Sequence, residues 1–215
     1  MNTDLGDYRK SYEKQELLEE HLSDNPLEVF QKWFHEVDTY FNIGETNAMT
    51  LSTIGLDGFP KSRVVLLKKF TYEGFIFYTN YESEKGKAIT NNPNVCLSFF
   101  WPEAERQVII KGKAEKIAEN LSDGYFESRP RGSQLGALVS NQSEIIKDRD
   151  ALEQRLKSLE DRFEGKPIPR PKFWGGFIVK PIEIEFWQGR PNRLHDRIRY
   201  QLDKNYNWNM NRLAP

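Results

Sequence analysis

Two arginines and a histidine lie close together near the C-terminal end of the sequence. Arg193, His195 and Arg197 alternate with Leu194 and Asp196. In an extended segment, this period of two places the three basic side chains on one face. Two guanidinium groups beside an imidazole repel one another, so this face is expected to bind an anion or a polar, electron-rich ring. A solvated edge strand is the alternative.

Two further segments offer groups that bind phosphate, although the sequence contains neither a Rossmann glycine fingerprint nor a P-loop. Arg63 and Lys68 stand at the two ends of an apolar strand, where a spacing of five places them on opposite faces unless a bulge intervenes. Tyr78 and Thr79 end the next strand, and Lys85 follows in the first turn of a helix. Solvated strand ends and an ordinary capped helix are the alternatives.

A third phosphate candidate is the set Tyr125, Arg129 and Ser133, which recurs every four residues. On a continuous helix these side chains would share one face, but Pro130 is expected to break the helix. A phenol, a guanidinium and a hydroxyl that converge on one point suit a phosphate monoester. A helix and turn with solvated charged residues is an equally good account of the pattern.

Composition limits the kinds of partner. The chain of 215 residues carries a formal net charge of -1, which argues against a general nucleic-acid or membrane-surface binder. Its one cysteine, Cys96, excludes an internal disulfide framework and a cysteine-based zinc site. The acidic N-terminus lacks the apolar segment of a signal peptide, and no run of eighteen apolar residues is present. We therefore expect a cytoplasmic protein without bound metal.

The hydrophobic pattern predicts a mainly β (α+β) fold. Residues 1–25 are expected to form a mobile segment with a marginal helix over 7–21, and residues 26–215 a single domain. A helix should run from Pro26 to Phe41. Closely spaced strands favour a closed antiparallel barrel over a βαβ sheet. The predicted strands are 48–54, 62–69, 75–79, 95–101, 107–114, 177–179, 182–188, 197–202 and 208–212, and the other helices are 85–91, 119–127, 130–139 and 149–164.

The C-terminal segment also carries a family resemblance. Glu-Phe-Trp-Gln at 185–188, four further residues and Arg-Leu-His-Asp-Arg at 193–197 resemble the signature of the pyridoxine/pyridoxamine 5'-phosphate oxidases, and residues 26–215 are similar to that family throughout. The resemblance implies an FMN-binding split β-barrel with peripheral helices. It also implies a homodimer with two flavin sites built across the subunit interface.

The same resemblance implies roles for individual residues. Arg63 would pair with the FMN phosphate, Lys68 would reach the substrate phosphate, and Gln107 would face the isoalloxazine edge. Arg193 and His195 would lie against the substrate ring as the catalytic residues. The implied FMN contacts are Arg63, Val64, Val65, Leu66, Leu67, Lys68, Tyr78, Thr79, Lys85, Gln107, Gln142, Ser143, Trp187 and Arg197. The implied substrate contacts are Lys68, Tyr125, Arg129, Ser133, Arg193, Leu194, His195, Arg9 and Tyr12.

The implied reaction is the oxidation of pyridoxine 5'-phosphate or pyridoxamine 5'-phosphate to pyridoxal 5'-phosphate, with O2 as the final acceptor. A split-barrel flavin reductase and a non-catalytic carrier of FMN or pyridoxal phosphate are the alternatives. The sequence departs from the family at Glu84, where many members carry arginine. A carboxylate cannot bind phosphate, so Glu84 is expected to pair with Lys85 or Lys87 and to weaken FMN binding.

Overall fold

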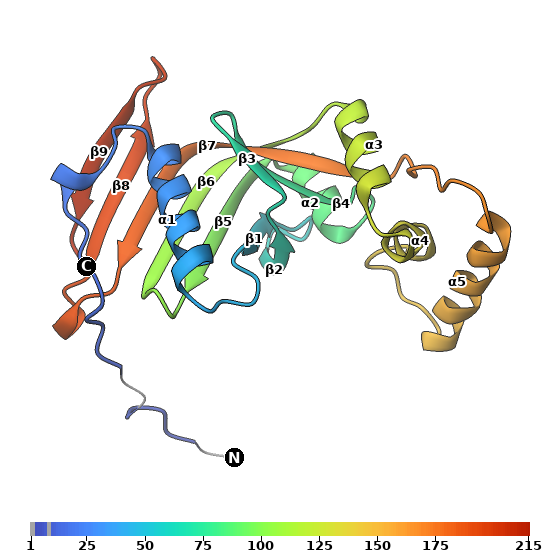
Figure 1. The fold of residues 1–215 in the computed structure, drawn as a ribbon, viewed down its shortest axis with the longest axis horizontal. Coiled ribbons are helices and arrows are strands. Elements are labelled where there is room, and N and C mark those ends of the chain that lie inside the picture. Colours follow the sequence, from blue (N-terminus) through green and yellow to red (C-terminus); the bar gives the residue numbers. More distant parts are fainter. Residues whose placement is uncertain (1–2, 8–9) are drawn as a thin grey trace. The chain divides into compact units, whose positions relative to one another are not determined.

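The computed structural model describes residues 3–7 and 10–215. Figure 1 shows its helices and strands, and its contacts divide the chain into two compact units. Unit 1 comprises Met1–Thr50, Leu97–Lys111 and Pro181–Pro215, and unit 2 comprises Leu51–Cys96 and Gly112–Lys180. Among the described residues, no helix combines the length and apolar character needed to cross a membrane.

The helices and strands follow the order that the sequence predicts. The α-helices are α1 Pro26–Tyr40, α2 Glu84–Asn91, α3 Glu119–Ser128, α4 Arg131–Val139 and α5 Arg149–Phe163. The strands are β1 Ala48–Ile54, β2 Pro60–Leu66, β3 Lys69–Thr71, β4 Gly74–Asn80, β5 Asn94–Trp101, β6 Arg106–Lys116, β7 Trp174–Gln188, β8 Asp196–Leu202 and β9 Trp208–Leu213. Short 3₁₀ turns occupy Glu19–His21 and Pro191–Arg193.

Within the described part of the chain, nine strands form one sheet in the order β2-β1-β5-β6-β7-β4-β3, with β8 pairing β7 and β9. β7 is one strand where two were expected on either side of Pro181, and the single strand expected over 62–69 is divided into β2 and β3. Along one edge of β7, antiparallel pairing with β4 ends at Val179 and pairing with β8 begins at Glu183. Pro181 lies between these two ladders, so its missing N–H group interrupts neither of them.

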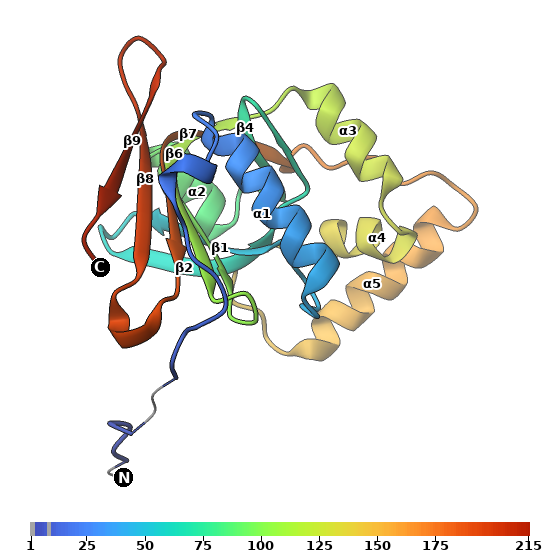
Figure 2. The ribbon, with the colours of Figure 1, turned by 60° about the vertical axis from the view of Figure 1, so that its left-hand side comes forward.

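The core of unit 1 is aromatic, and α1 supplies one side of it (Figure 2). Asn25 caps α1 by accepting a hydrogen bond from the Leu27 N–H group, and Pro26 occupies the first turn. The ring of Phe30 lies 5.2 Å from that of Phe99 on β5, and Trp33 lies 5.2 Å from Phe186 on β7. The predicted helix and its buried aromatic face are confirmed.

Unit 2 builds a second core from β4, β7 and the helices. Phe77 and Phe177 are paired across β4 and β7, with stacked rings 5.8 Å apart. Figure 2 shows α4 and α5 side by side in this unit. A buried cluster under α3 and α4 comprises Phe126, Leu135, Ile168 and Trp174. This cluster fixes the positions of the segments that carry Tyr125, Arg129 and Ser133.

The helix expected over residues 7–21 is wrong for the part that the structure describes. Residues 10–18 are not helical, because charged side chains leave this segment too little apolar surface to support a helix. Ion pairs hold it instead. Arg212 on β9 donates two hydrogen bonds of 2.6 Å to the Glu19 carboxylate, and this contact lowers the pKa of Glu19 to about 2.

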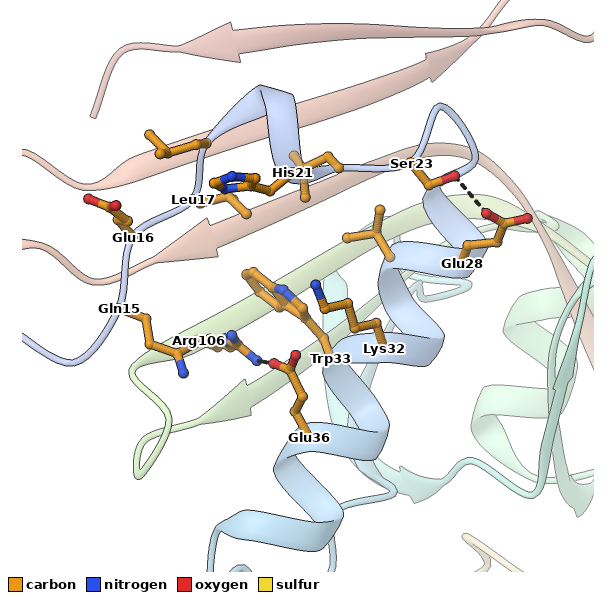
Figure 3. A pocket seen from close by; sticks show the side chains of 13 residues that line it. Gln15, Glu16, Leu17, His21, Ser23, Glu28, Lys32, Trp33, Glu36 and Arg106 are labelled. Atoms are coloured by element: carbon orange, nitrogen blue, oxygen red, sulfur yellow. Dashed lines mark hydrogen bonds and ion pairs between the residues drawn. The ribbon is translucent and has the colours of Figure 1, made fainter.

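Arg106 on β6 joins this N-terminal segment to α1 (Figure 3). Its side chain is only 6% exposed and lies over the Trp33 ring, with 4.3 Å from the guanidinium carbon to the ring centroid. Arg106 donates hydrogen bonds to Glu36 at 2.7 Å, to Gln188 at 3.0 Å and to Gln15. These contacts border a hollow of about 630 Å³ between α1 and residues 15–23.

Removing the carboxylate of Glu36 should destabilise the protein by about 1–3 kcal/mol, because a buried guanidinium would lose its charged acceptor. The change Glu36→Ala can be measured by urea denaturation. Asp38→Ala is the matched control, because Asp38 is an exposed carboxylate on the same helix, and it should shift stability by less than about 0.5 kcal/mol. Equal stability of the two variants would contradict a stabilising role for the Glu36–Arg106 pair.

Candidate functional site

Unit 2 contains a hollow of about 460 Å³ that gathers most of the predicted phosphate-binding residues. We call it the unit 2 hollow. Two groups of residues that lie far apart in sequence line it together: the end of β2 and β4, and the α3–α4 segment. The predicted residues in its wall are Val64, Val65, Leu66, Lys68, Tyr78, Thr79, Lys85, Tyr125, Arg129, Ser133 and Gln142.

The break between α3 and α4 is present, yet it does not separate the predicted set. α3 ends at Ser128, Arg129 is its extended C-cap residue, and α4 starts after Pro130. Tyr125, Arg129 and Ser133 nevertheless line the same hollow. The turn at Pro130 therefore brings a phenol, a guanidinium and a hydroxyl to one wall, as the spacing predicts.

Aromatic rings form the floor beside Arg129. The rings of Tyr78 and Tyr125 stack 3.9 Å apart, and Tyr78 stacks on Trp174 at 5.5 Å. The Arg129 guanidinium lies 4.6 Å from the Trp174 ring, a favourable cation–π distance. Its Nη1 atom is buried and has no hydrogen-bond partner among the described residues. A buried donor of this kind is an expected place for an anionic ligand to bind.

Two other predicted phosphate-binding cations of unit 2 are Lys85, which lines the hollow, and Arg63. Lys85 donates a hydrogen bond of 2.8 Å to the Gln142 side chain, which also accepts one from Thr79. Burial lowers the pKa of Lys85, and the charge of Arg63 lowers it further. Arg63 is not in the wall of the hollow, because its guanidinium donates to the Leu51 carbonyl at 3.2 Å and to Thr53 at 2.7 Å.

The prediction that Glu84 pairs with Lys85 or Lys87 is wrong. Its carboxylate accepts two hydrogen bonds from Lys61 on β2, at 2.6 and 2.7 Å, rather than pairing with Lys85 or Lys87. Ser83 caps α2 by accepting a hydrogen bond from the N–H group of Gly86, so Glu84 is the first helical residue. This position turns its side chain toward the β2 strand and away from a pairing within its own helix.

Unit 1 contains, apart from the hollow beside α1, another hollow of about 780 Å³ that includes the proposed catalytic residues. We call only this one the unit 1 hollow. Its wall combines the end of β7, the Pro191–Arg193 turn and the N-terminal segment. The residues lining it are Lys10, Ser11, Tyr12, Trp187, Arg190, Asn192, Arg193 and His195.

Residues 193–197 do not form one extended segment, so the shared face that an extended chain would give Arg193, His195 and Arg197 does not form. Asn192 and Arg193 both have positive φ, at 56° and 62°, and β8 begins only at Asp196. Arg193 and His195 still line one hollow, but Arg197 does not. Consecutive non-glycine residues in the left-handed region are costly, and such strain gathers at functional sites. The exposed Arg193 side chain has no ion-pair partner among the described residues.

The hydrogen bond and the charges around His195 define its protonation state and tautomer. Its Nδ1 atom accepts a hydrogen bond of 3.1 Å from the backbone N–H of Arg190. Burial lowers the pKa of His195, the charge of Arg193 lowers it further, and Asp196 opposes both. A neutral imidazole whose Nδ1 accepts carries its proton on Nε2. Nε2 is therefore a hydrogen-bond donor at the unit 1 hollow.

Other predicted residues lie outside both hollows. Arg197 donates two hydrogen bonds to the Glu185 carboxylate, at 2.8 and 3.1 Å, and a third to the Ala214 carbonyl. Gln107 is half-buried on β6, and Leu67 is buried. The remaining predicted residues are Leu194, which is exposed, Ser143, which has a positive φ of 77° beside Gln142, and Arg9, which lies outside the described residues.

Sequence reasoning missed several residues of the two hollows. Trp174, Asn80 and Ser140 line the unit 2 hollow, and Lys10 and Arg190 line the unit 1 hollow. Arg190 lies inside the recognised C-terminal segment, so its charge beside Gly189 was an available signal. Trp174 carries no comparable signal, because an isolated tryptophan before an apolar run is typical of a core residue.

Comparison with known proteins extends this picture over the whole chain. Residues 35–163 match the family model described as pyridoxamine 5'-phosphate oxidase, and residues 174–215 match the model of the pyridoxine 5'-phosphate oxidase C-terminal dimerisation region. The chain belongs to the pyridoxine/pyridoxamine 5'-phosphate oxidase family. A relative from Flavobacterium psychrophilum with that name is 70% identical over 212 residues, covering 99% of each chain. A second, from Christiangramia forsetii, is 54% identical over the full length of both.

Solved structures agree with this assignment. PhzG from Burkholderia lata, in complex with tetrahydrophenazine-1-carboxylic acid, superposes with a TM-score of 0.86 at 29% identity, covering 93% of this chain and 98% of that one. An FMN-binding protein from Nostoc punctiforme shares the fold, with a TM-score of 0.68 at 14% identity, covering 90% of this chain and 99% of that one. The predicted fold class, a split β-barrel with peripheral helices, is confirmed, and the chain is an oxidoreductase of this oxidase family.

Tyr12 packs over the unit 1 hollow of this oxidase-family protein. Its ring lies 5.6 Å from Trp187 and 5.7 Å from His195. A methyl group added at Gly189 would lie 2.7 Å from the Cβ and Cγ atoms of Tyr12, which is closer than real contacts allow. Gly189 therefore permits the close approach of the N-terminal segment.

Gly189→Ala should displace Tyr12 and make the peptide bonds that follow Lys10 and Lys14 accessible to trypsin. The measurement is the initial rate of limited trypsin cleavage in this segment, which should rise by about tenfold if contacts of roughly 1–2 kcal/mol are lost. Gly124→Ala is the control, since a methyl group there meets nothing within 4 Å. Unchanged cleavage in Gly189→Ala would mean that the Tyr12 contact does not hold the segment.

Proposed function

We propose that this protein is an FMN-dependent oxidase that converts pyridoxine 5'-phosphate or pyridoxamine 5'-phosphate to pyridoxal 5'-phosphate. Bound FMN would supply the redox chemistry: a hydride from the substrate C4' carbon would go to the flavin N5 atom, and O2 would then be reduced to hydrogen peroxide. The chain itself would bind and orient the two ligands and would balance their negative charge. Family membership supports this reaction class.

The observation that carries the proposal is the unpartnered guanidinium nitrogen of Arg129. It is buried beside an aromatic floor in the unit 2 hollow, where Ser133 and Tyr125 offer hydroxyl groups. Lys68 adds a second positive charge to the same wall. These groups suit the phosphate of a pyridine vitamer, because a phosphate monoester accepts several charge-assisted hydrogen bonds at once.

Residues of unit 2 beside this hollow also suit the phosphate of FMN. Arg63 and Lys85 would hold its phosphate, and the side chains of Thr79 and Gln142 would complete that cradle. Gln107 would provide a donor and an acceptor for the isoalloxazine edge. The other proposed flavin contacts are Val64, Val65, Leu66, Leu67, Lys68, Tyr78, Ser143, Trp187 and Arg197, and Arg197 would have to engage FMN while keeping or exchanging its Glu185 partner.

In this proposal, Arg193 and His195 act on the substrate ring. The exposed, unpaired guanidinium of Arg193 would orient the ring and stabilise its electron density. It would not act as a base, because an arginine does not lose its proton in proteins. The Nε2–H group of His195 would donate a hydrogen bond to a substrate oxygen or nitrogen. Tyr12 would limit the entry of water, and Leu194 and Arg9 remain predicted contacts.

We also propose a homodimer with two flavin sites built across the subunit interface. The match of residues 174–215 to a dimerisation region supports the assembly. A cytoplasmic location and a mobile segment over residues 1–25 stay predictions. Size-exclusion chromatography with light scattering tests the dimer directly.

An aerobic assay of the purified, FMN-loaded protein with both phosphorylated vitamers tests the reaction. Yellow protein that consumes O2 and forms pyridoxal 5'-phosphate is the expected result. Yellow protein without turnover would support a carrier instead. Bleaching that depends on a nicotinamide cofactor, without oxidation of either vitamer, would support a flavin reductase.

Arg193→Leu should lower kcat/KM by about 10- to 100-fold, the effect of losing one charge-assisted hydrogen bond, while the FMN dissociation constant changes by less than about threefold. The rate is followed by O2 consumption and FMN binding by quenching of flavin fluorescence. Arg155→Leu on the exposed face of α5 is the control and should leave both values unchanged. Full activity in Arg193→Leu would remove Arg193 from the site.

The pH dependence of kcat/KM, which reports pKa values of the free enzyme, should show the neutral state of His195. Because its pKa is lowered, the active neutral form persists as pH falls to the ordinary histidine pKa of 6.5, and activity should be lost only below it. Protonation would remove the Nδ1 acceptor and add positive charge beside Arg193. In His195→Gln, which keeps a donor but cannot titrate, this acid limb should flatten. An unchanged acid limb in the variant would assign the titration to another group.

A further inference from the structure

Glu84 and Lys61 form an ion pair beside the cations of the proposed FMN phosphate cradle. Lys61 donates to both carboxylate oxygens of Glu84, at 2.7 and 2.6 Å. Lys61 and Arg63 are two residues apart on β2 and therefore share a face of that strand. Lys85 directly follows Glu84 in α2. The pair thus borders both positive charges that would hold the phosphate.

The Glu84 carboxylate acts electrostatically on both of these cations. Burial lowers the pKa of Arg63 and the pKa of Lys85, and the negative charge of Glu84 opposes this lowering at both residues. The backbone N–H of Glu84 donates a hydrogen bond to the Ser143 hydroxyl at 3.3 Å, which fixes the start of α2 next to the Gln142–Ser143 segment. A negative charge is therefore held where a phosphate dianion would have to arrive.

A carboxylate at this position opposes phosphate binding unless its own charge is balanced. Lys61 is the residue that balances it, because it is the ion-pair partner of Glu84. Both side chains are about half exposed, at 57% and 48%, so solvent screens the pair without abolishing it. Without Lys61, the carboxylate would face the phosphate and would compete with it for Arg63 and Lys85.

We propose that Lys61 is a positioning residue for FMN, which acts by neutralising Glu84 beside the phosphate and not by contacting the phosphate itself. This inference rests on the proposed function, since it requires the cradle to bind FMN. It assigns a role to a residue outside the recognised flavin-binding pattern. It also explains how this chain tolerates a carboxylate at a position where an anion must bind.

The test is a double-mutant cycle in FMN affinity, measured on apo-protein by quenching of flavin fluorescence. Lys61→Ala should weaken FMN binding by about three- to fivefold, and Glu84→Gln should tighten it by a similar factor, as expected for one partly exposed charge. In the double variant Lys61→Ala/Glu84→Gln, removal of Lys61 should have no further effect. The affinity of the double variant should equal that of Glu84→Gln alone.

Two controls isolate the phosphate and the position of the charge. Riboflavin, which lacks the phosphate, should bind all four proteins equally, and this also verifies that the variants are folded. Lys87→Ala removes an exposed positive charge from the same helix and should leave FMN affinity unchanged. At roughly 1 M salt, where charges are screened within about 3 Å, the effect of Lys61→Ala should disappear.

Each other outcome overturns a defined part of the inference. If wild-type protein binds FMN and Lys61→Ala binds it equally well, Lys61 has no role. An equal loss on removal of Lys61 from the wild-type protein and from the Glu84→Gln variant would mean that Lys61 contacts the phosphate directly. Loss of riboflavin binding in Lys61→Ala would reduce its role to structural support. If the wild-type protein does not bind FMN at all, the proposed function fails first and the inference with it.

Discussion

A buried guanidinium N–H group costs stability unless it meets an acceptor, and two arginines of this chain differ in this respect. Arg106 lies on Trp33 and donates hydrogen bonds to Glu36, Gln188 and Gln15. Each of its three guanidinium nitrogens therefore has an acceptor within the fold. Arg129 lies on Trp174, yet its Nη1 atom has no acceptor among the described residues. An unsatisfied buried donor costs about 1–3 kcal/mol, which an arriving anion would recover. The contrast separates an arginine whose donors are used within the fold from one that we propose binds a ligand.

The aromatic floor connects the two sets of proposed contacts in unit 2. Tyr78, a proposed flavin contact, stacks at 3.9 Å on Tyr125, a proposed substrate contact, and both lie parallel to Trp174. Close-packed rings move together, because separating them would open a void. The stacked rings therefore connect β4 directly to α3, and both tyrosines pack against the buried cluster that contains Phe126 and Trp174.

The sequence predicted the elements well, because their signals are local. The cap at Asn25, the cap at Ser83 and the break at Pro130 each act within one helical turn. Interactions between distant segments were harder to predict. The Lys61–Glu84 pair joins residues 23 positions apart, and nothing in the spacing favours Lys61 over Lys87. Period-two reasoning about residues 193–197 does not describe their backbone, because it assumes an extended chain.

The same reason applies to several other residues of the proposed site. Lys68 follows the end of β2, Arg129 is the C-cap of α3, and Gln142 follows α4. Arg193 occupies a left-handed turn, and His195 precedes β8. Residues at the ends of elements are free of the helical and strand periods, so a periodic pattern cannot assign their direction. They are also the positions where a side chain can leave the packed core and reach a ligand. The same geometry therefore suits these residues to binding and makes their direction difficult to predict from periodicity.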